Sequence, residues 1–183
     1  MGGWTVAAPC MDALTWWARE KPCEGRLPVA EHHYEIAVAW TGNQGRGTSS
    51  YQDYGRSHIV SADGLPEIRG TADPSFRGSS DAWNPEQLFL AAVSQCHLLT
   101  YLALCAKHGV VVTEYVDEPF GTMTSRPTGG GRFTDVLLRP HVTVASADQV
   151  DKAHGLHEQA NELCFIAQSV SVPVRHEPTV ASR

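Results

Sequence analysis

The sequence predicts an α+β fold in which antiparallel β-sheets wrap around long central helices. The first observation behind this prediction is the order of the elements: strands, one long helix, strands, a second helix and a last strand. The second is that apolar residues alternate along the strand segments, whereas the helical segments begin with capping residues. The third is composition, because 183 residues that are 42% hydrophobic and 19% charged suffice for one globular domain with its own core.

The first strands are expected between residues 33 and 73. The segment His33–Trp40 alternates, and it places four apolar side chains on one face: Tyr34, Ile36, Val38 and Trp40. Three further segments are expected to continue an antiparallel meander: 48–54, 57–62 and 68–73. Asp63 and Gly64 are typical of a tight turn between two of these strands. Residues 74–83 are expected to form a loop.

A long helix is expected to follow this loop. Asn84 is a good N-cap, Pro85 suits the first helical position, and Gln87 stands three residues after the cap, as in a capping box. A mostly apolar stretch runs on to Ala106, and Gly109 can end the helix in a left-handed conformation. The helix should span about 24 residues, or roughly 36 Å. Because it is apolar nearly all round, we expect it to be buried on most sides, in part by a second subunit.

The second half of the chain is expected to hold strands around a second helix. The strand segments are 110–112, 121–125, 132–138, 141–145 and 170–174. The glycines at 129–131 mark the turn of a hairpin. A helix is expected from Ala147 to about Ala167, with Ser146 and Gln149 as its capping box.

The chain is expected to divide into an N-terminal arm, residues 1–30, and one domain, residues 31–183. The arm lacks the charged start and the apolar middle of a secretory signal, so it is a flexible arm, a docked helix or sequence upstream of the natural start. No uninterrupted apolar run approaches the roughly 20 residues that a membrane span needs. The net charge of −6 does not favour nucleic acid as a partner. We therefore expect a cytoplasmic protein that binds neither nucleic acid nor membranes.

Five cysteines bear on the redox chemistry of the chain: Cys10, Cys23, Cys96, Cys105 and Cys164. An odd count without a secretory signal argues against a disulfide framework, and the absence of a CxxC pair argues against a structural zinc knuckle. Taken alone, a cysteine in an apolar helix is usually a small core residue, and this applies most strongly to Cys105. Cys96 lies roughly 15 Å from the start of its helix, so the helix dipole does little for its thiolate. A reactive Cys96 therefore needs a cation from elsewhere.

One motif resembles a known family. The segment from Asn84 to His97, NPEQLFLAAVSQCH, is similar to the signature of the OsmC/Ohr family, the osmotically inducible and organic hydroperoxide resistance proteins. That signature places a carboxylate after Asn-Pro, here Glu86, and the peroxide-attacking cysteine ten residues further along, here Cys96. Cys164 stands where the family has its second cysteine. The likeness extends over about residues 31–180 in the order of the elements.

The resemblance implies an intertwined homodimer and a thiol peroxidase. The Cys96 thiolate would attack a hydroperoxide, Cys164 would close a disulfide with the resulting sulfenic acid, and an external dithiol of the lipoyl type or a small thiol would reduce it. No bound cofactor and no metal is implied. In the family, proline often follows the second cysteine, whereas Phe165 follows Cys164 here, which leaves the helix free to continue.

The resemblance also implies an arginine that holds Cys96 as a thiolate and is oriented by Glu86. Arg46, in a glycine-rich turn, ranks first, and Arg77, just before the helix, is the alternative; Arg56 is also available. Glu86 and Cys96 are about 15 Å apart along one helix, so one arginine cannot readily reach both within a single chain. Two such helices that cross near Ala91 would solve this, and we predict an active site at a two-fold interface.

Several alternatives stay open at this stage. The apolar helix could line a pocket for an alkyl tail through Phe89, Val93 and Leu99. The same fold could instead serve as a dimeric binding protein for small hydrophobic ligands, with little peroxidase activity. A zinc site could use three residues on one side of the second helix, namely His154, His157 and Cys164. A Cys-His hydrolase is the remaining enzyme class, but no nucleophile turn is recognisable.

Overall fold

The structure of the chain is a computed structural model, and it describes residues 30–183. The chain divides after Glu35, and the elements described below all lie in the unit 36–183. The predicted N-terminal arm, residues 1–30, falls almost entirely outside the described residues and stays a prediction.

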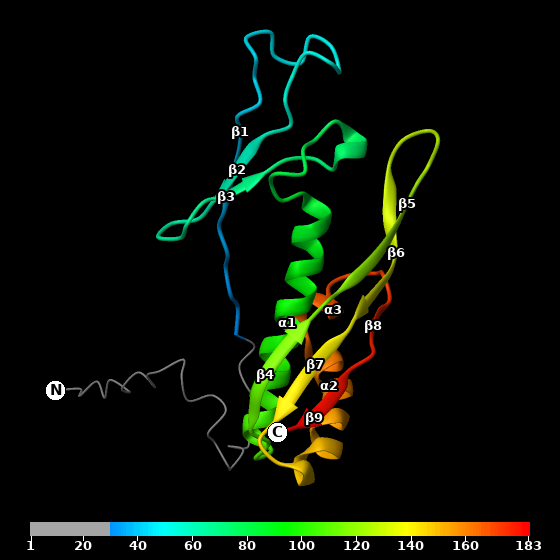
Figure 1. The fold of residues 1–183 in the computed structure, drawn as a ribbon. Coiled ribbons are helices and arrows are strands. Elements are labelled where there is room, and N and C mark those ends of the chain that lie inside the picture. The colour runs from blue at the N-terminus through cyan, green and yellow to red at the C-terminus, as the bar shows by residue number, and fades with distance from the viewer. Residues whose placement is uncertain (1–29) are drawn as a thin grey trace, which may run out of the picture. The chain divides into compact units, whose positions relative to one another are not determined.

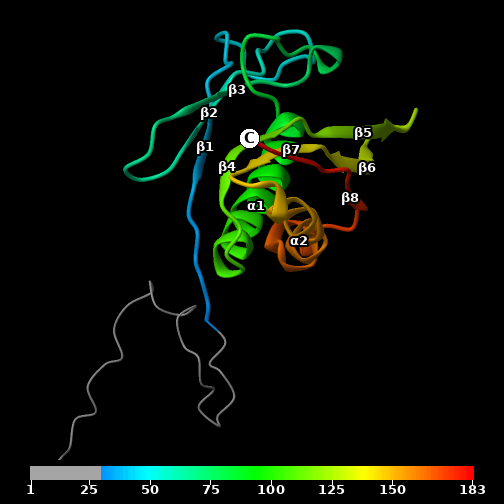
Figure 2. The same ribbon diagram turned by 60° about the horizontal axis from the view of Figure 1, so that its bottom comes forward.

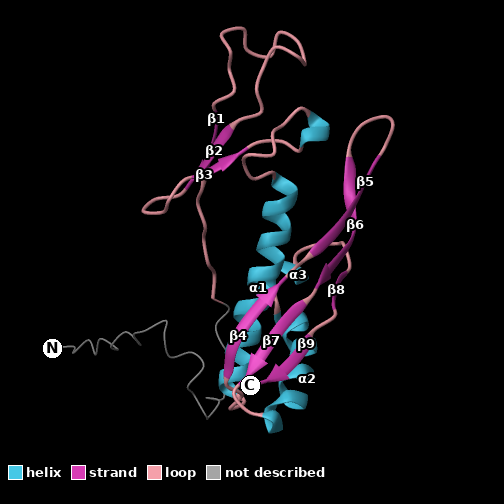
Figure 3. Ribbon diagram, in the orientation of Figure 1, coloured by secondary structure: helices cyan, strands magenta, loops and turns pink. Residues whose placement is uncertain are grey.

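The unit 36–183 contains nine strands, three α-helices and two short 3₁₀ helices (Figures 1 and 3). In chain order they are β1 (Ala37–Trp40), β2 (His58–Ser61), β3 (Ile68–Gly70), η1 (Pro74–Phe76), α1 (Pro85–Lys107), β4 (Val112–Asp117), β5 (Phe120–Ser125), β6 (Gly131–Leu138), β7 (Pro140–Val144), η2 (Ala147–Gln149), α2 (Val150–Leu163), α3 (Phe165–Gln168), β8 (Val174–His176) and β9 (Thr179–Ser182). The prediction of an α+β fold built on long central helices is confirmed.

The strands form three sheets of three strands each, in the orders β1-β2-β3, β4-β7-β9 and β5-β6-β8. The hairpin pairs are antiparallel as expected, but β8 and β9 pair parallel with β6 and β7. The prediction of a single last strand at 170–174 is therefore wrong, because the chain forms β8 and β9 after that segment. Pro173 has no N–H to offer a ladder, so pairing begins only at Val174, and the chain returns as two short strands. Figure 2 shows β7 and β8 beside α1 and α2.

The first sheet is shorter than the sequence predicts. β1 starts at Ala37 rather than His33, and the strand expected at 48–54 is absent, replaced by turns and bends. Side chains explain this, because the Arg56 guanidinium lies over the rings of both Tyr51 and Tyr54, 4.3 and 4.0 Å from their centroids. It also donates hydrogen bonds to the carbonyl groups of both tyrosines. These contacts fold the segment back on itself, so it cannot extend into a strand.

Helix α1 begins as predicted. Its capping box is complete, with Gln87 N donating to Asn84 Oδ1 at 2.8 Å and Asn84 N donating to Gln87 Oε1 at 3.1 Å. One stripe of the helix is buried: Val93, His97, Tyr101, Leu104 and Cys105. The opposite side leaves Leu99 64% and Leu102 37% exposed. Within one chain, the expected burial on most sides is therefore not reached.

By length and composition alone, α1 could cross a membrane, since its best 18-residue window has a mean hydropathy of 1.7. This is weak evidence for a span, because the core helix of a globular protein passes the same test. The buried stripe of α1 packs into two hydrophobic clusters of the domain. One joins its second half to α2, β4 and β7, and the other joins Val93 to Val136 and Leu138 of β6.

The second long helix differs most from its prediction. The segment 147–167 is a 3₁₀ turn, then α2, then a break at Cys164, then the short α3. The predicted capping box of Ser146 and Gln149 is wrong, since Ser146 makes no capping hydrogen bond. Gln149 instead accepts from Val111 N and donates to Gly109 O, at 3.0 and 3.2 Å. Its amide thus ties the start of α2 to the end of α1, a long-range contact that outcompetes the local cap.

Candidate active site

The fold brings Cys96 and Cys164 together from two helices. Cys96 lies in the middle of α1 and is half-buried, whereas Cys164 is fully buried where α2 ends and α3 begins. Burial, and after it a side-chain hydrogen bond with the nearby Cys96 thiol, together raise the pKa of Cys164 to about 11. Both are free thiols, and Cys164 is protonated at neutral pH.

The break in the helix at Cys164 positions its sulfur. Cys164 has an extended backbone, with φ −70° and ψ 111°, and its Sγ accepts a hydrogen bond from Ala167 N at 3.4 Å, as the N-cap of α3. The expectation that Phe165, in place of proline, would let the helix continue is therefore wrong. The extended conformation of Cys164 ends α2 without a proline, and the side chain of Phe165 then points outward, 82% exposed.

Cys105 is a core residue, as expected for a cysteine in an apolar helix. It is 1% exposed, and burial raises the pKa of its thiol. It packs with Tyr101 and Leu104 in the cluster that joins α1 to α2. Of the three cysteines in the described residues, only the other two can react with each other without unfolding the core.

Glu86 lies in the first turn of α1, where the helix dipole favours a negative charge. Its Oε2 is buried and has no hydrogen-bond partner among the described residues. A buried carboxylate oxygen without a donor opposes folding, so a donor is expected to complete this site. An arginine that pairs with this carboxylate would satisfy the oxygen.

The structure separates the candidate arginines by what they already contact. Arg56 already lies over two tyrosine rings and donates hydrogen bonds to the carbonyl groups of the same tyrosines. Arg46 lies in the exposed loop after β1, and Arg77 ends η1 with a left-handed backbone, φ +66°. No hydrogen bond or ion pair of either side chain occurs within residues 30–183. A left-handed conformation is uncommon for a residue other than glycine and is often found at functional sites.

The three predicted pocket residues are not brought together. Phe89 packs against Phe133, with ring centroids 4.7 Å apart, and Val93 is fully buried in the same cluster. Leu99 lies on another side of α1, because it follows Val93 by six residues, which correspond to one full turn of the helix and about 240° more. Five apolar side chains that lie close to the two cysteines in the sequence are exposed instead: Leu99, Leu102, Leu163, Phe165 and Ile166. One sequence signal could have indicated that Phe165 belongs near the site, namely its place directly after Cys164.

Two buried histidines join α1 to α2, and the sequence did not pair them. His97 Nε2 and His157 Nδ1 are 3.0 Å apart in a hydrogen bond, and the two rings are nearly coplanar, 6° apart. Tyr101 stacks on His157 at 3.9 Å and donates a hydrogen bond to Ala153 O at 3.2 Å. Burial lowers the pKa of His97 to about 4 and that of His157 to about 3, so both are neutral at pH 7.

The zinc site considered from the sequence does not form. His154 is exposed whereas His157 is buried, so the two do not share a side of α2 open to one ion. Within the described part of the chain, no group of three or more histidine, cysteine or carboxylate side chains is arranged to hold a metal. The outer nitrogens, His97 Nδ1 and His157 Nε2, have no hydrogen-bond partner among the described residues.

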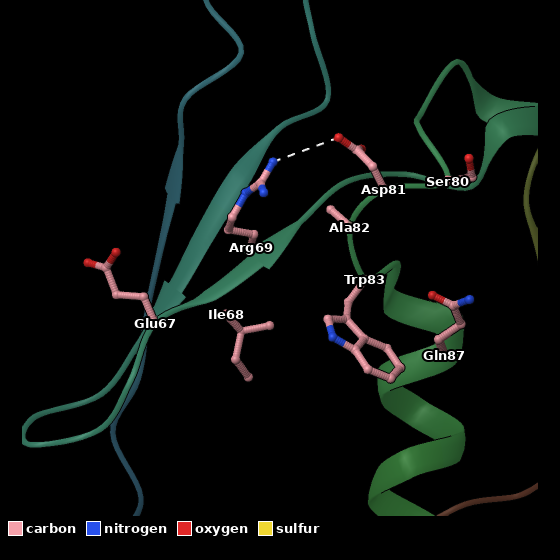
Figure 4. A pocket seen from close by; sticks show the side chains of 8 residues that line it. All are labelled: Glu67, Ile68, Arg69, Ser80, Asp81, Ala82, Trp83 and Gln87. Carbon is pink, nitrogen blue, oxygen red and sulfur yellow. Dashed lines mark ion pairs between the residues drawn. The ribbon is translucent and has the colours of Figure 1, made fainter.

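A cavity of about 550 Å³ lies at the start of α1 (Figure 4). Its lining residues are Glu67, Ile68, Arg69, Ser80, Asp81, Ala82, Trp83 and Gln87. Arg69 pairs with Asp81 across 3.8 Å, and both side chains are largely exposed. A second cavity, of about 420 Å³, lies at the tip of the β5–β6 hairpin. Neither is lined by Cys96 or Cys164, so the two cysteines do not sit in either cavity.

Comparisons with known proteins bear on the fold and the family of the chain. The family model described as OsmC-like protein matches residues 78–178, a span that includes Glu86, Cys96 and Cys164. An OsmC-like protein of unknown function from Vibrio cholerae has a solved structure that is 29% identical, with a TM-score of 0.73, over 81% of this chain and all of the other. An organic hydroperoxide resistance protein from Elizabethkingia anophelis shares the fold, with a TM-score of 0.59 and 18% identity, over 84% of this chain and all of the other.

An uncharacterised protein of Bacillus subtilis, YmaD, is 23% identical over 148 residues, which cover 78% of this chain and 89% of YmaD. The matched family model covers more than half of the 183 residues, including both cysteines of the site. The solved Vibrio cholerae structure shares the fold over 81% of this chain. The chain therefore belongs to the family of OsmC-like proteins.

Proposed function

We propose that the protein is a thiol peroxidase that reduces organic hydroperoxides to alcohols. The observation that supports this most is the meeting of Cys96 and Cys164, from two different helices, in a chain of this family. Two structurally similar proteins, from Elizabethkingia anophelis and Legionella pneumophila, are described as organic hydroperoxide resistance proteins. The different burial of the two sulfurs supports a division of roles between them.

In the first step, the Cys96 thiolate attacks the terminal oxygen of the hydroperoxide. The O–O bond breaks, the alkoxide takes up a proton and leaves as the alcohol, and Cys96 becomes a sulfenic acid. In the second step, the Cys164 sulfur attacks the Cys96 sulfur, and the hydroxyl group leaves with the Cys164 proton as water. An external dithiol then reduces the disulfide and is itself oxidised to a disulfide. No resident cofactor or metal takes part.

The environments of the sulfurs suit this order of events. Cys96 is half-buried and can meet a substrate, whereas Cys164 is enclosed. The raised pKa of Cys164, about 11, keeps it a thiol and a weak nucleophile, so it does not compete for the peroxide. The exposed apolar side chains next to the cysteines, Leu99 and Phe165 among them, favour a substrate with an alkyl part.

A homodimer completes this site. The unpartnered Glu86 Oε2 needs a donor, and α1 leaves an apolar side uncovered. If two copies of α1 cross near Ala91, Glu86 of one subunit approaches Cys96 of the other, and Arg46 or Arg77 bridges the two groups. Light scattering tests this part of the proposal, because a stable and fully active monomer would contradict it.

We place the protein in the cytoplasm, where small dithiols are reduced.

The same apolar surroundings favour one other function. Exposed Leu99, Leu163 and Phe165 could hold a small hydrophobic ligand without any redox step. A dimeric binding protein of this kind would keep the fold, but Cys96 would react with peroxide no faster than a free thiol.

Stopped-flow measurement of alkyl hydroperoxide consumption separates the two functions. The reduced wild-type protein is compared with Cys96→Ser and Cys164→Ser, and Cys105→Ser is the matched control from the same helix. Peroxidase function predicts rapid oxidation that is lost with Cys96→Ser, and over-oxidation of Cys96 in Cys164→Ser. If the wild type reacts as slowly as a free thiol, the peroxidase proposal fails and the binding function stands.

A further inference from the structure

Two buried histidines hold α1 against α2 and take no part in the thiol chemistry above. His97 directly follows Cys96 on α1, and His157 lies about two helical turns before Cys164 on α2. Their hydrogen bond of 3.0 Å runs in line with both rings, since the ring centroids are 5.3 Å apart and the planes differ by 6°. The hydrogen bond from Tyr101 to Ala153 O, at 3.2 Å, lies in the same contact between the helices.

The pair is built in a way that stability alone does not explain. Both rings are fully buried, and His97 Nδ1 and His157 Nε2 have no partner among the described residues. Buried nitrogens without partners oppose folding, and two apolar side chains of similar size would pack without this penalty. An in-line hydrogen bond does what apolar contact does not, because it fixes both the separation and the rotation of the two helices.

The cysteines are sensitive to that geometry. A disulfide tolerates only a narrow range of Cα separations and of dihedral angles about its S–S bond, roughly plus or minus 90°. Cys96 is adjacent to one end of the hydrogen bond, and Cys164 lies at the end of the helix that bears the other. A small rotation or shift of α2 along α1 would therefore move the Cys164 sulfur out of line with Cys96.

We propose that His97 and His157 are a positioning pair, whose hydrogen bond sets α2 against α1 so that Cys164 can form a disulfide with Cys96. The inference rests on the proposed function for its biological role. It can nevertheless be tested without any peroxide, because oxidised dithiothreitol converts two protein thiols into a disulfide and is itself reduced.

Amide variants provide a matched test. Nδ1 of histidine is as many bonds from Cα as the amide group of asparagine, and Nε2 is as many bonds away as the amide group of glutamine. His157 uses Nδ1, so His157→Asn should keep the bond and His157→Gln should lose it. His97 uses Nε2, so the expectation reverses, with His97→Gln keeping the bond and His97→Asn losing it. His154→Asn, an exposed histidine on the same helix, is the control.

The measurement is the equilibrium constant between the protein dithiol and dithiothreitol, from mass analysis of alkylated protein. We expect His157→Gln and His97→Asn to disfavour the disulfide at least tenfold, and the other variants to stay within about threefold of wild type. Circular dichroism confirms which variants are folded, and if one position does not tolerate its variants, the other gives the same contrast.

Each outcome decides the proposal. If asparagine and glutamine behave alike at a position where both fold, or if the folded wild type forms no disulfide, the positioning role is overturned. If the reciprocal pattern appears while the wild type consumes no peroxide, the positioning role stands and the peroxidase function fails.

Discussion

The two parts of the described domain differ in how they are held together. From α1 onward, buried residues of the helices and of the β-sheets form two hydrophobic clusters, and the His97–His157 hydrogen bond joins α1 to α2. The sheet β1-β2-β3 contributes no residue to either cluster, and every residue of β1 is exposed. The side chains of β1 nevertheless alternate as in a strand with one buried face, although Val38 on its apolar face is 62% exposed. The second part is thus held by contacts within the chain, whereas the first part leaves an apolar face exposed, which the homodimer proposed above would cover.

The sharpest way to test this comparison is to remove a side chain from the second part. Leu138 is fully buried against Val93 and Val136. Leu138→Ala should lower the free energy of unfolding by about 2–5 kcal/mol, because it leaves a cavity that the neighbours fill only in part. Denaturant unfolding measures this loss, and it should be the same at two protein concentrations, because the cluster lies within one chain. A loss below about 1 kcal/mol would contradict the assignment of this cluster to the core.

Acid should weaken the second part through its histidine pair. The folded protein holds the pKa of His97 at about 4 and that of His157 at about 3, whereas the unfolded chain has the ordinary value of 6.5. The unfolded state therefore binds protons first, so stability is full above pH 6.5 and falls as the pH drops toward 4 and then 3. The slope is on the order of 1 kcal/mol per pH unit for each histidine.

Denaturant unfolding between pH 7 and pH 5 measures this slope above the range in which most carboxylates titrate. His97→Gln should reduce it, because one of the two titrating groups is gone. The charged or titratable neighbours of the pair are His176, His154, Tyr101 and the Glu158 that contacts His176. His154→Asn, which removes one neighbouring histidine and leaves the pair intact, is the control. An unchanged slope in His97→Gln would show that other groups dominate.

Substitution in the first part should act on assembly rather than on folding. Val38→Thr keeps the shape of an exposed β-strand side chain and replaces one of its methyl groups with a hydroxyl group. In a monomer, such a surface change alters stability by no more than about 0.5 kcal/mol. If the face is covered by a second copy, the dissociation constant of the dimer should rise about tenfold, or about 1.4 kcal/mol. Sedimentation velocity across a dilution series gives the constant, and an unchanged value would place the interface elsewhere.

The smallest of these effects concerns the junction of the two parts. Asn84 caps α1 through its bond to Gln87 N, at 2.8 Å. Asn84→Ala should lower the free energy of unfolding by about 1 kcal/mol. Asn84→Ser should lower it much less, because a serine hydroxyl can also cap the helix. Thermal unfolding of the two variants side by side measures the difference. If both lose the same amount, the cap contributes little to the helix.

Local sequence signals were enough where structure depends on near neighbours. The capping box at Asn84, the left-handed Gly109 and the hairpin around the glycines at 129–131 all lie where they were predicted. The local signals failed where residues distant in the sequence compete for the same hydrogen-bonding or charged groups. Gln149 binds Gly109 and Val111 instead of capping its own helix, and Arg56 draws two tyrosines into a turn where a strand was expected.

The candidate site divides in the same way. The motif from Asn84 to His97 and the later Cys164 were enough to predict the family and the two cysteines, because residue type and spacing are properties of the chain. The substrate-lining residues could not be predicted from apolar character alone. Phe89 and Val93 turned out to be core residues, since only packing decides which side of an apolar helix is covered.

By itself, then, the sequence determined the α+β class, the long helix α1 and its cap, the family and the pair of cysteines, all of which follow from local backbone preferences and motif spacing. Only the tertiary structure decided that α2 ends at Cys164, that its thiol is enclosed with a raised pKa, and that His97 meets His157 across two helices. The physical reason is that burial and hydrogen bonding between distant residues depend on how the elements pack, and packing is not encoded in any one segment.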